Sequence, residues 1–168
     1  MTSRAVDPLP SLAEVARALA APGQPTAGFE ALDRASARTI GHKLFTVLLF
    51  HSETGESERL YSNQPKAYPV GGRKPLNSTF WSEHVLRRQM PYIGRSYDDV
   101  RAVFFDHELI RSLGCESVLN LPVVIDRRTL GTINLLHQAG WYEDAHIEVG
   151  CILAALAVPG LAMLQERR

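Results

Sequence analysis

The sequence predicts an α+β domain in which helices flank an antiparallel sheet. Apolar runs of strand length occur in two pairs, over 44–63 and 116–137, and each pair is joined by a short polar turn. Helical segments precede, separate and follow these pairs. Strands joined by tight turns run antiparallel, whereas parallel strands need long crossover connections. The order therefore favours an antiparallel sheet over an alternating α/β fold.

Two helices are expected before the first strand. Ser11 and Glu14 have the spacing of a capping box, which predicts a helix that runs from there to Ala20. A second helix is expected after Pro25, because apolar residues recur on one face up to Gly41. These apolar residues are Phe29, Leu32, Ala35 and Ile40. We therefore expect an N-terminal extension with a short helix over 1–24 and the main domain over 25–168.

The first strand, over 44–50, is almost wholly apolar, which is typical of a central strand covered on both faces. After a turn at 53–56, its partner runs from Arg59 to Asn63 and contains Tyr61. The segment 77–114 is expected to hold a helix over 80–89, an edge strand over 92–95 and a helical stretch over 97–112. The first of these helices is expected to be capped by Asn77-Ser78-Thr79.

A last helix is expected over 143–164, with a kink at Pro159. The helices at the two ends of the chain should cover one face of the sheet together. The segment 77–114 should then cover the other face more loosely. Such a loose cover leaves room for a cavity beneath it.

The register of the second strand pair follows from keeping each face chemically consistent. A three-residue turn at 126–128 places Ile125 opposite Thr129 and Asn120 opposite Asn134. One face is then purely aliphatic, with Leu119, Leu121, Val123, Ile133 and Leu135. The other face carries Val118, Asn120, Pro122, Thr132, Asn134 and Leu136. Because buried asparagines need partners, Asn120 and Asn134 either bond each other, the backbone or solvent, or orient a small ligand.

Composition narrows the functional classes. Eighteen basic and eighteen acidic residues give no net charge, which argues against nucleic acid or an anionic membrane as a partner. The longest apolar stretch, over 151–164, is shorter than the ~20 residues of a membrane span. The N-terminus does not resemble a secretory signal, and two cysteines are too few for a disulfide framework. We therefore expect a cytoplasmic protein.

Three segments in order carry a family resemblance. Residues 114–123, Gly-Cys-Glu-Ser-Val-Leu-Asn-Leu-Pro-Val, are followed by Leu-Gly-Thr-Ile-Asn-Leu at 130–135 and by Tyr-Glu-Asp at 142–144, which opens the last helix. Together they resemble a GAF domain over about 26–165. The resemblance implies a six-stranded antiparallel sheet, with N- and C-terminal helices on one face and a helical or loop cover over a ligand pocket on the other. It also implies dimerisation through the first and last helices.

GAF domains include sensors of cyclic nucleotides, haem, bilins and small metabolites, and domains that bind nothing. Residues 105–108, Phe-Asp-His-Glu, only partly match the cyclic-nucleotide motif, so Asp106 and Glu108 are expected on the solvated surface. The histidines show no metal-ligand spacing, and no catalytic set is recognised. The cofactor stays unknown. The expected ligand-binding residues are Tyr61, Trp81, Phe104, Phe105, Ile110, Cys115, Asn120, Thr132 and Asn134.

The leading hypothesis is a sensory module that binds a small, partly apolar molecule and signals through dimer helices to a separate partner protein. One alternative is a thiol-dependent enzyme like the free methionine sulfoxide reductases of this family. It would use Cys115, but Glu116 beside it disfavours a thiolate, and Cys151 lies in an apolar helix. Another alternative is a dimerisation module with an empty pocket. An enzyme is the less favoured of these hypotheses.

Overall fold

The computed structural model describes residues 6–76 and 79–167. Within them, six strands form one antiparallel sheet in the order β3-β2-β1-β6-β5-β4. The strands are β1 (Leu44–His51), β2 (Glu56–Ser62), β3 (Arg73–Pro75), β4 (Tyr92–Gly94), β5 (Ser117–Ile125) and β6 (Arg128–His137). The six-stranded antiparallel sheet, the central first strand and the edge strand near 92–95 are confirmed.

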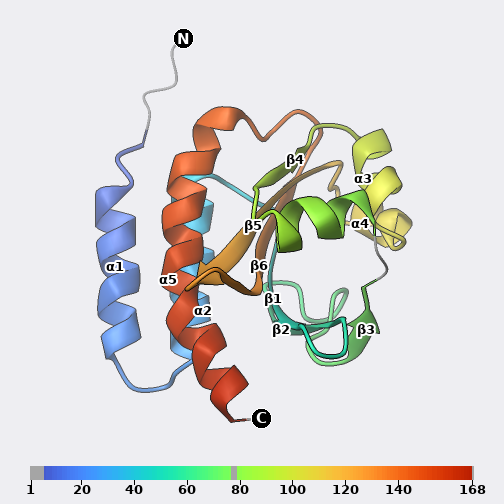
Figure 1. Cartoon of the computed structure of the whole chain (residues 1–168). Coiled ribbons are helices and arrows are strands. Elements are labelled where there is room, and N and C mark those ends of the chain that lie inside the picture. The colour runs from blue at the N-terminus through green and yellow to red at the C-terminus, as the bar shows by residue number, and fades with distance from the viewer. Residues whose placement is uncertain (1–5, 77–78, 168) are drawn as a thin grey trace.

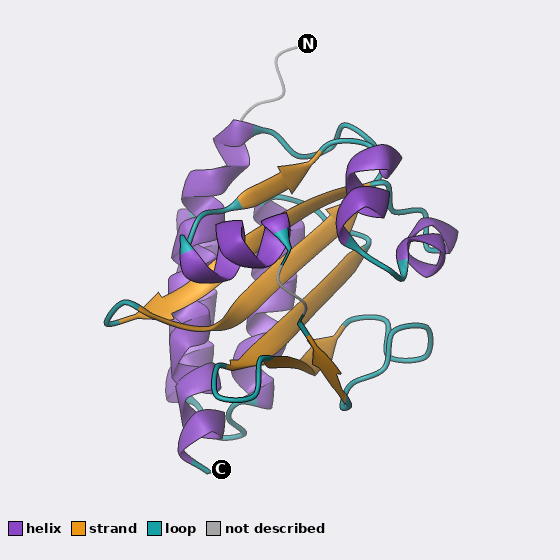
Figure 2. Ribbon diagram, turned by 45° about the vertical axis from the view of Figure 1, so that its right-hand side comes forward, coloured by secondary structure: helices purple, strands orange, loops and turns teal. Residues whose placement is uncertain are grey.

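The helices lie in layers on the two faces of this sheet (Figure 1). They are α1 (Leu9–Ala20), α2 (Thr26–Thr39), α3 (Tyr97–Val103), α4 (His107–Ser112) and α5 (Ile147–Glu166), with the π-helix η1 (Ser82–Arg87) and the 3₁₀ turn η2 (Asp144–His146). The helices α2 and α5 cover one face, and α1 packs outside them against both. The opposite face is covered by η1, α3 and α4 (Figures 1 and 2).

The alternation of β1 divides the interior into two parts. Phe45, Val47 and Leu49 are fully buried in the core under α2 and α5. Leu44 belongs instead to a separate cluster under α3 and α4. The paired strands β5 and β6 follow the same division, so the predicted aliphatic face packs against the helical layer. A sheet buried on both faces explains why the run 44–50 shows no alternating polarity.

The predicted pairing of the β5–β6 hairpin is confirmed at its centre, but the predicted turn was wrong. Asn120 pairs with Asn134, and Pro122 pairs with Thr132. The turn is formed by two residues, not three, with φ of 48° at Asp126 and 59° at Arg127. Ile125 therefore faces Arg128, and the register shifts between Val123 and Val124. A bulge restores the register that a three-residue turn would have given.

Gly131 has a steric reason for its place in β6. A side chain at this position would put its Cβ 1.9 Å from the carbonyl oxygen of Leu48 in β1. That distance is far inside van der Waals contact, and the obstacle is backbone. Only glycine allows β6 to approach β1 this closely beside the bulge.

Both predicted helix caps need comment. The capping box at Ser11 and Glu14 was wrong, because α1 begins at Leu9 after Pro8 and encloses Ser11. Glu14 binds Arg34 and Arg38 of α2 instead, and these two guanidinium groups lower the pKa of its carboxyl. Of the cap predicted at 77–79, Asn77 and Ser78 lie outside the described residues. Thr79 caps the following helix by exchanging hydrogen bonds with Ser82.

The last helix, α5, begins at Ile147 after the turn η2, a few residues later than expected, and runs two residues past Leu164 with Pro159 inside it. By length and composition alone, the helical segment Asp144–Glu166 is apolar enough to cross a membrane, with a mean hydropathy of 2.1 over an 18-residue window. The expected shortfall in length was therefore wrong. The buried side of α5 packs on β5, β6 and α2, and the core helix of a soluble domain passes the same test. The kink stays a prediction.

A cavity between the sheet and its cover

A cavity of about 330 Å³, partly open to solvent, lies between the sheet and the segment that covers it. Its floor comes from the strands β1, β5 and β6, one side from β2 and β3, and its roof from the region between Leu76 and Ile110. The floor residues are Leu44, Thr46, Leu48, Asn120, Asn134 and Leu136. This floor is the mixed face of the hairpin together with the same face of β1.

A chain of hydrogen bonds crosses the floor. Trp81 Nε1 donates to Asn120 Oδ1 over 2.9 Å, and Asn120 Nδ2 donates to Asn134 Oδ1 over 2.7 Å. Asn134 Nδ2 then donates to Thr46 Oγ1 over 3.2 Å. The Thr46 hydroxyl can also donate, and no acceptor for its hydrogen is found among the described residues. The chain therefore ends in a free donor on the cavity floor.

Asn120 and Asn134 were expected either to bond each other, the backbone or solvent, or to face a ligand. The two amides bond each other, and both also line the cavity. Only 1% of Asn120 and 4% of Asn134 are exposed, so their partners are needed to offset the loss of water. The chain of four side chains fixes the orientation of each amide, and the Thr46 hydroxyl at its end is left to donate a hydrogen bond.

An aromatic wall stands over this floor. The Trp81 ring is buried and meets the Phe104 ring edge-on, with 6.2 Å between centroids. Ile110 of α4 completes this apolar part of the lining. Phe105 lies at the rim, 78% exposed. The structure thus brings four of the expected site residues, Trp81, Phe104, Phe105 and Ile110, to the same cavity.

The side of the cavity formed by β2 and β3 carries charges that the sequence did not indicate. Arg59 of β2 and Lys74 of β3 line it together with Tyr68 and Asp106. The Tyr68 hydroxyl donates to Asp106 Oδ2. Burial, followed by the charge of Asp106, raises the pKa of Tyr68, so its hydroxyl keeps the proton. The expectation that Asp106 belongs to the solvated surface was wrong, because it ties the loop after β2 to the start of α4.

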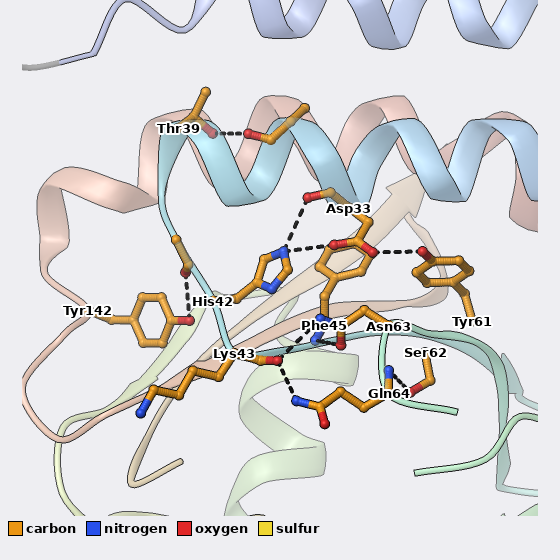
Figure 3. Close-up of polar contacts among 12 residues, drawn as sticks. Asp33, Thr39, His42, Lys43, Phe45, Tyr61, Ser62, Asn63, Gln64 and Tyr142 are labelled. Carbon is orange, nitrogen blue, oxygen red and sulfur yellow. Dashed lines mark hydrogen bonds and ion pairs between the residues drawn. The ribbon is translucent and has the colours of Figure 1, made fainter. Parts of the chain in front are cut away.

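Tyr61 lies on the other side of the sheet, and its prediction as a cavity residue was wrong. Its hydroxyl donates to Asp33 of α2 over 2.7 Å, as Figure 3 shows. The register of β1 and β2 pairs Val47 with Tyr61 and Leu48 with Arg59, which leaves Leu60 as an extra residue. This bulge turns Tyr61 toward the helices and Arg59 toward the cavity, although residues two apart normally share a face.

The Tyr61 contact is part of a polar network between α2 and the sheet (Figure 3). His42 Nε2 lies 2.9 Å from Asp33 Oδ1, and its side chain is 4% exposed. Asn63 Oδ1 accepts from the backbone N–H of Phe45 over 2.8 Å. At the far end of α2, Tyr142 donates to the carbonyl of Gly41 over 3.0 Å. The helical layer is thereby fastened to the strands that form the cavity floor.

Cys115 and Thr132 are buried beside the cavity without lining it. Cys115 packs among Leu44, Val100 and Ile110, and burial raises the pKa of its thiol to about 11. Such a thiol is protonated at neutral pH and is a poor nucleophile. Cys151 is a free, exposed residue of α5. Thr132 Oγ1 is buried without a partner among the described residues.

Among the described residues, no group of three histidine, cysteine, aspartate or glutamate side chains is placed to hold a metal ion. The polar cavity residues that sequence reasoning missed include Thr46, Arg59, Tyr68, Lys74 and Asp106. Of these, Thr46 alone could have been found from the sequence, because it is the one polar residue in the apolar run 44–50. The others depend on the bulge in β2 and on the folding of a loop, which local pattern does not reveal.

An antiparallel sheet with a cavity under one cover and a helical layer on its other face defines an α+β domain with a cavity beside its sheet. No family model matches the chain, and no curated protein sequence matches it. Solved structures do. The GAF domain of a phosphoenolpyruvate-protein phosphotransferase from Coxiella burnetii matches with a TM-score of 0.78 at 15% identity, over 98% of each chain.

Two further solved structures are similar. The GAF domain of a phosphoenolpyruvate-protein phosphotransferase from Acinetobacter matches with a TM-score of 0.75 at 14% identity, over 95% of each chain. The GAF domain of a two-component sensor histidine kinase from Bacillus halodurans matches with a TM-score of 0.64 at 18% identity, over 83% of this chain and 95% of that one. The chain therefore has the GAF-domain fold.

Proposed function

We propose that residues 25–168 form a sensory domain that binds a small, partly apolar molecule in the cavity. The hydrogen-bond chain from Trp81 to Thr46 carries this proposal, because it presents an oriented free donor inside an apolar cavity. Concave, mostly apolar sites with a few placed polar groups are typical of small-molecule binding. The site residues proposed are Trp81, Phe104, Phe105, Ile110, Asn120 and Asn134, with Thr46 added.

The cavity volume limits the ligand. About 330 Å³ equals the liquid volume of about eleven water molecules at roughly 30 Å³ each. This space is too small to enclose a haem or a bilin. It lies at the lower end of the roughly 300–1,000 Å³ range of small-molecule sites.

We further propose that binding is reported through α2 and α5 in a cytoplasmic homodimer, to a separate partner protein. The polar network at Asp33, His42 and Tyr61 supports this route, because it joins α2 to the strands behind the cavity floor. An apolar outer side of α5, where Ile152 is 47% exposed, supports a dimer through this helix. A signal then requires that the bound molecule favours one helix arrangement over another. Residues 1–24, which include α1, would act as an extension of this helical layer.

The thiol-enzyme alternative gains no support from the geometry, since Cys115 is buried with a raised pKa. The alternative of an empty dimerisation module is separated from a sensor by native mass spectrometry of the purified chain. We expect a retained small molecule on a dimer. The variant Leu48→Phe fills the floor of the cavity and should lose the retained mass while staying dimeric.

A matched control is Leu109→Phe, which adds the same side chain at a residue that is 40% exposed and outside the cavity lining. The control should retain the molecule. A wild-type protein that carries no added mass from several expression hosts and gains none from a metabolite extract would contradict the sensor. A monomer at micromolar concentration would contradict the proposed dimer.

A further inference from the structure

The β2–β3 side of the cavity is positively charged and its cations lack carboxylate partners. Among the described residues, neither Arg59 nor Lys74 lies within ion-pair distance of a carboxylate. Asp106 is the one carboxylate in the lining, and it already accepts the Tyr68 hydroxyl. The cavity therefore carries one more positive than negative charge. Arg59 is half-buried and Lys74 is exposed, so an anionic group placed there would form charge-assisted hydrogen bonds that no carboxylate of the lining supplies.

The head group of Arg59 is held in place before any ligand arrives. Its Nη1 donates to the carbonyl of Pro69 over 2.8 Å, and its guanidinium carbon lies 3.7 Å from the centroid of the Tyr68 ring. Its Nε is buried and has no partner among the described residues. A fixed guanidinium with an unused N–H suits an oxyanion, because less side-chain entropy is lost when the bond forms.

Lys74 stands on the next strand at the same end of the cavity. Its ammonium lies 4.6 Å from the centroid of the Phe105 ring, an exposed contact at the rim. In the antiparallel pairing of β2 with β3, Lys74 lies opposite Ser57, two residues along the strand from Arg59, and both cations line the cavity. Two cations on adjacent strands can bind the same oxyanion.

We propose that the molecule bound in this cavity is an organic oxyanion, a carboxylate or phosphate ester with an apolar body. Its anionic group binds Arg59 and Lys74, its apolar body contacts Trp81 and Phe104, and an acceptor on it meets the hydroxyl of Thr46. This inference rests on the proposed function and adds the chemical class of the ligand. The cations come from β2 and β3 and the aromatic rings from the roof segment, which sets the direction of binding.

Two fluorescent probes of matching shape test the proposal. They are 8-anilinonaphthalene-1-sulfonate, which is anionic, and N-phenyl-1-naphthylamine, which lacks the sulfonate. The full chain should bind the anionic probe more tightly. Arg59→Met should lower the affinity for the anionic probe about ten-fold or more, as expected for the loss of one charge-assisted hydrogen bond. Its affinity for the neutral probe should change by no more than about two-fold. Lys74→Met should weaken the anionic probe in the same direction.

The matched control is Arg73→Met, which removes one positive charge from β3 at a residue outside the cavity lining. It should leave the preference for the anionic probe unchanged. Circular dichroism of each variant should confirm that it is folded, since these probes also bind partly unfolded states with exposed apolar surface. Leu48→Phe should weaken both probes, which places them in the cavity.

The outcomes separate this inference from the proposed function. Equal binding of both probes, or an anion preference that survives both Arg59→Met and Lys74→Met, would overturn the oxyanion inference while leaving a cavity-binding domain. Binding of neither probe, or binding that Leu48→Phe does not weaken, would overturn both. Competition by benzoate and by phenyl phosphate distinguishes the two oxyanions. Benzyl alcohol is the uncharged control, and displacement by it as strong as that by the two anions would refute the inference.

Discussion

Replacement of Asn120 by leucine interrupts the hydrogen-bond chain in its middle. It removes the acceptor of Trp81 Nε1 and the donor to Asn134 Oδ1, and both atoms stay in a buried environment. Each buried polar atom left without a partner costs about 1–3 kcal/mol. The apolar gain from leucine offsets part of this cost. We therefore expect Asn120→Leu to lower the free energy of unfolding by about 2–4 kcal/mol.

A double-mutant cycle with Asn134→Leu sharpens this prediction. Each single variant orphans one atom of the Asn120–Asn134 bond, whereas the double variant removes both atoms and leaves only Trp81 and Thr46 without their partners. The double variant should therefore cost about 1–3 kcal/mol less than the sum of the singles. Urea unfolding followed by circular dichroism measures all four proteins. Losses of unfolding free energy that add within about 0.5 kcal/mol would refute the coupling of Asn120 and Asn134 in the hydrogen-bond chain.

The same variants test the cavity. Asn120→Leu and Asn134→Leu should each reduce the affinity for a molecule retained by the wild type, because the orientation of the Thr46 hydroxyl depends on the chain. Unchanged retention and unchanged affinity in both variants would contradict the assignment of the hairpin's mixed face to the ligand.

Three further predictions follow from single contacts. Because burial raises the pKa of Cys115 from 9.0 to about 11, the folded chain keeps a proton that the unfolded chain loses. The free energy of unfolding should thus fall as the pH rises from about 9 to about 11, and it should fall less in Cys115→Ala. An equal fall of the urea midpoint in the wild type and in Cys115→Ala would contradict this. Gly131→Ala, whose Cβ would meet backbone at 1.9 Å, should cost about 3 kcal/mol or more, and an unchanged midpoint would refute that steric argument. Tyr61→Phe should cost about 1–2 kcal/mol, since it removes a hydrogen bond to the partly solvated carboxylate of Asp33, and hydrogen exchange should become faster in α2. Unchanged exchange in α2 would show that this bond does not fasten the helix.

Face chemistry predicted the sheet better than turn chemistry did. The pairing of Asn120 with Asn134 follows from separating aliphatic from mixed positions, and that rule holds whichever turn closes the hairpin. The turn itself was wrong because two residues plus a bulge give the same central register as three. Sequence pattern fixes which residues share a face, but it does not locate a bulge that leaves those faces intact.

The candidate site was predictable where it depended on regular alternation and not where it depended on irregular backbone. Asn120, Asn134 and Trp81 lie at the cavity, and the sequence placed the first two from their face of the hairpin. Tyr61 lies on the face opposite to the one expected because of one bulge in β2, which separates it from the cavity residue Arg59. Lys74 and Asp106 reach the cavity from a short edge strand and a turn before α4, where local pattern carries little information.

Hydrogen exchange of the full chain, with and without saturating 8-anilinonaphthalene-1-sulfonate, tests the central claim that this cavity is the ligand site. Slower amide exchange in the presence of the probe is expected in the peptides that line the cavity, over 56–76 and 100–114. This protection should vanish in Leu48→Phe but persist in Leu109→Phe. Protection confined to the outer side of α5, around Ile152, would show that the probe binds an exposed apolar surface instead, and would contradict the account.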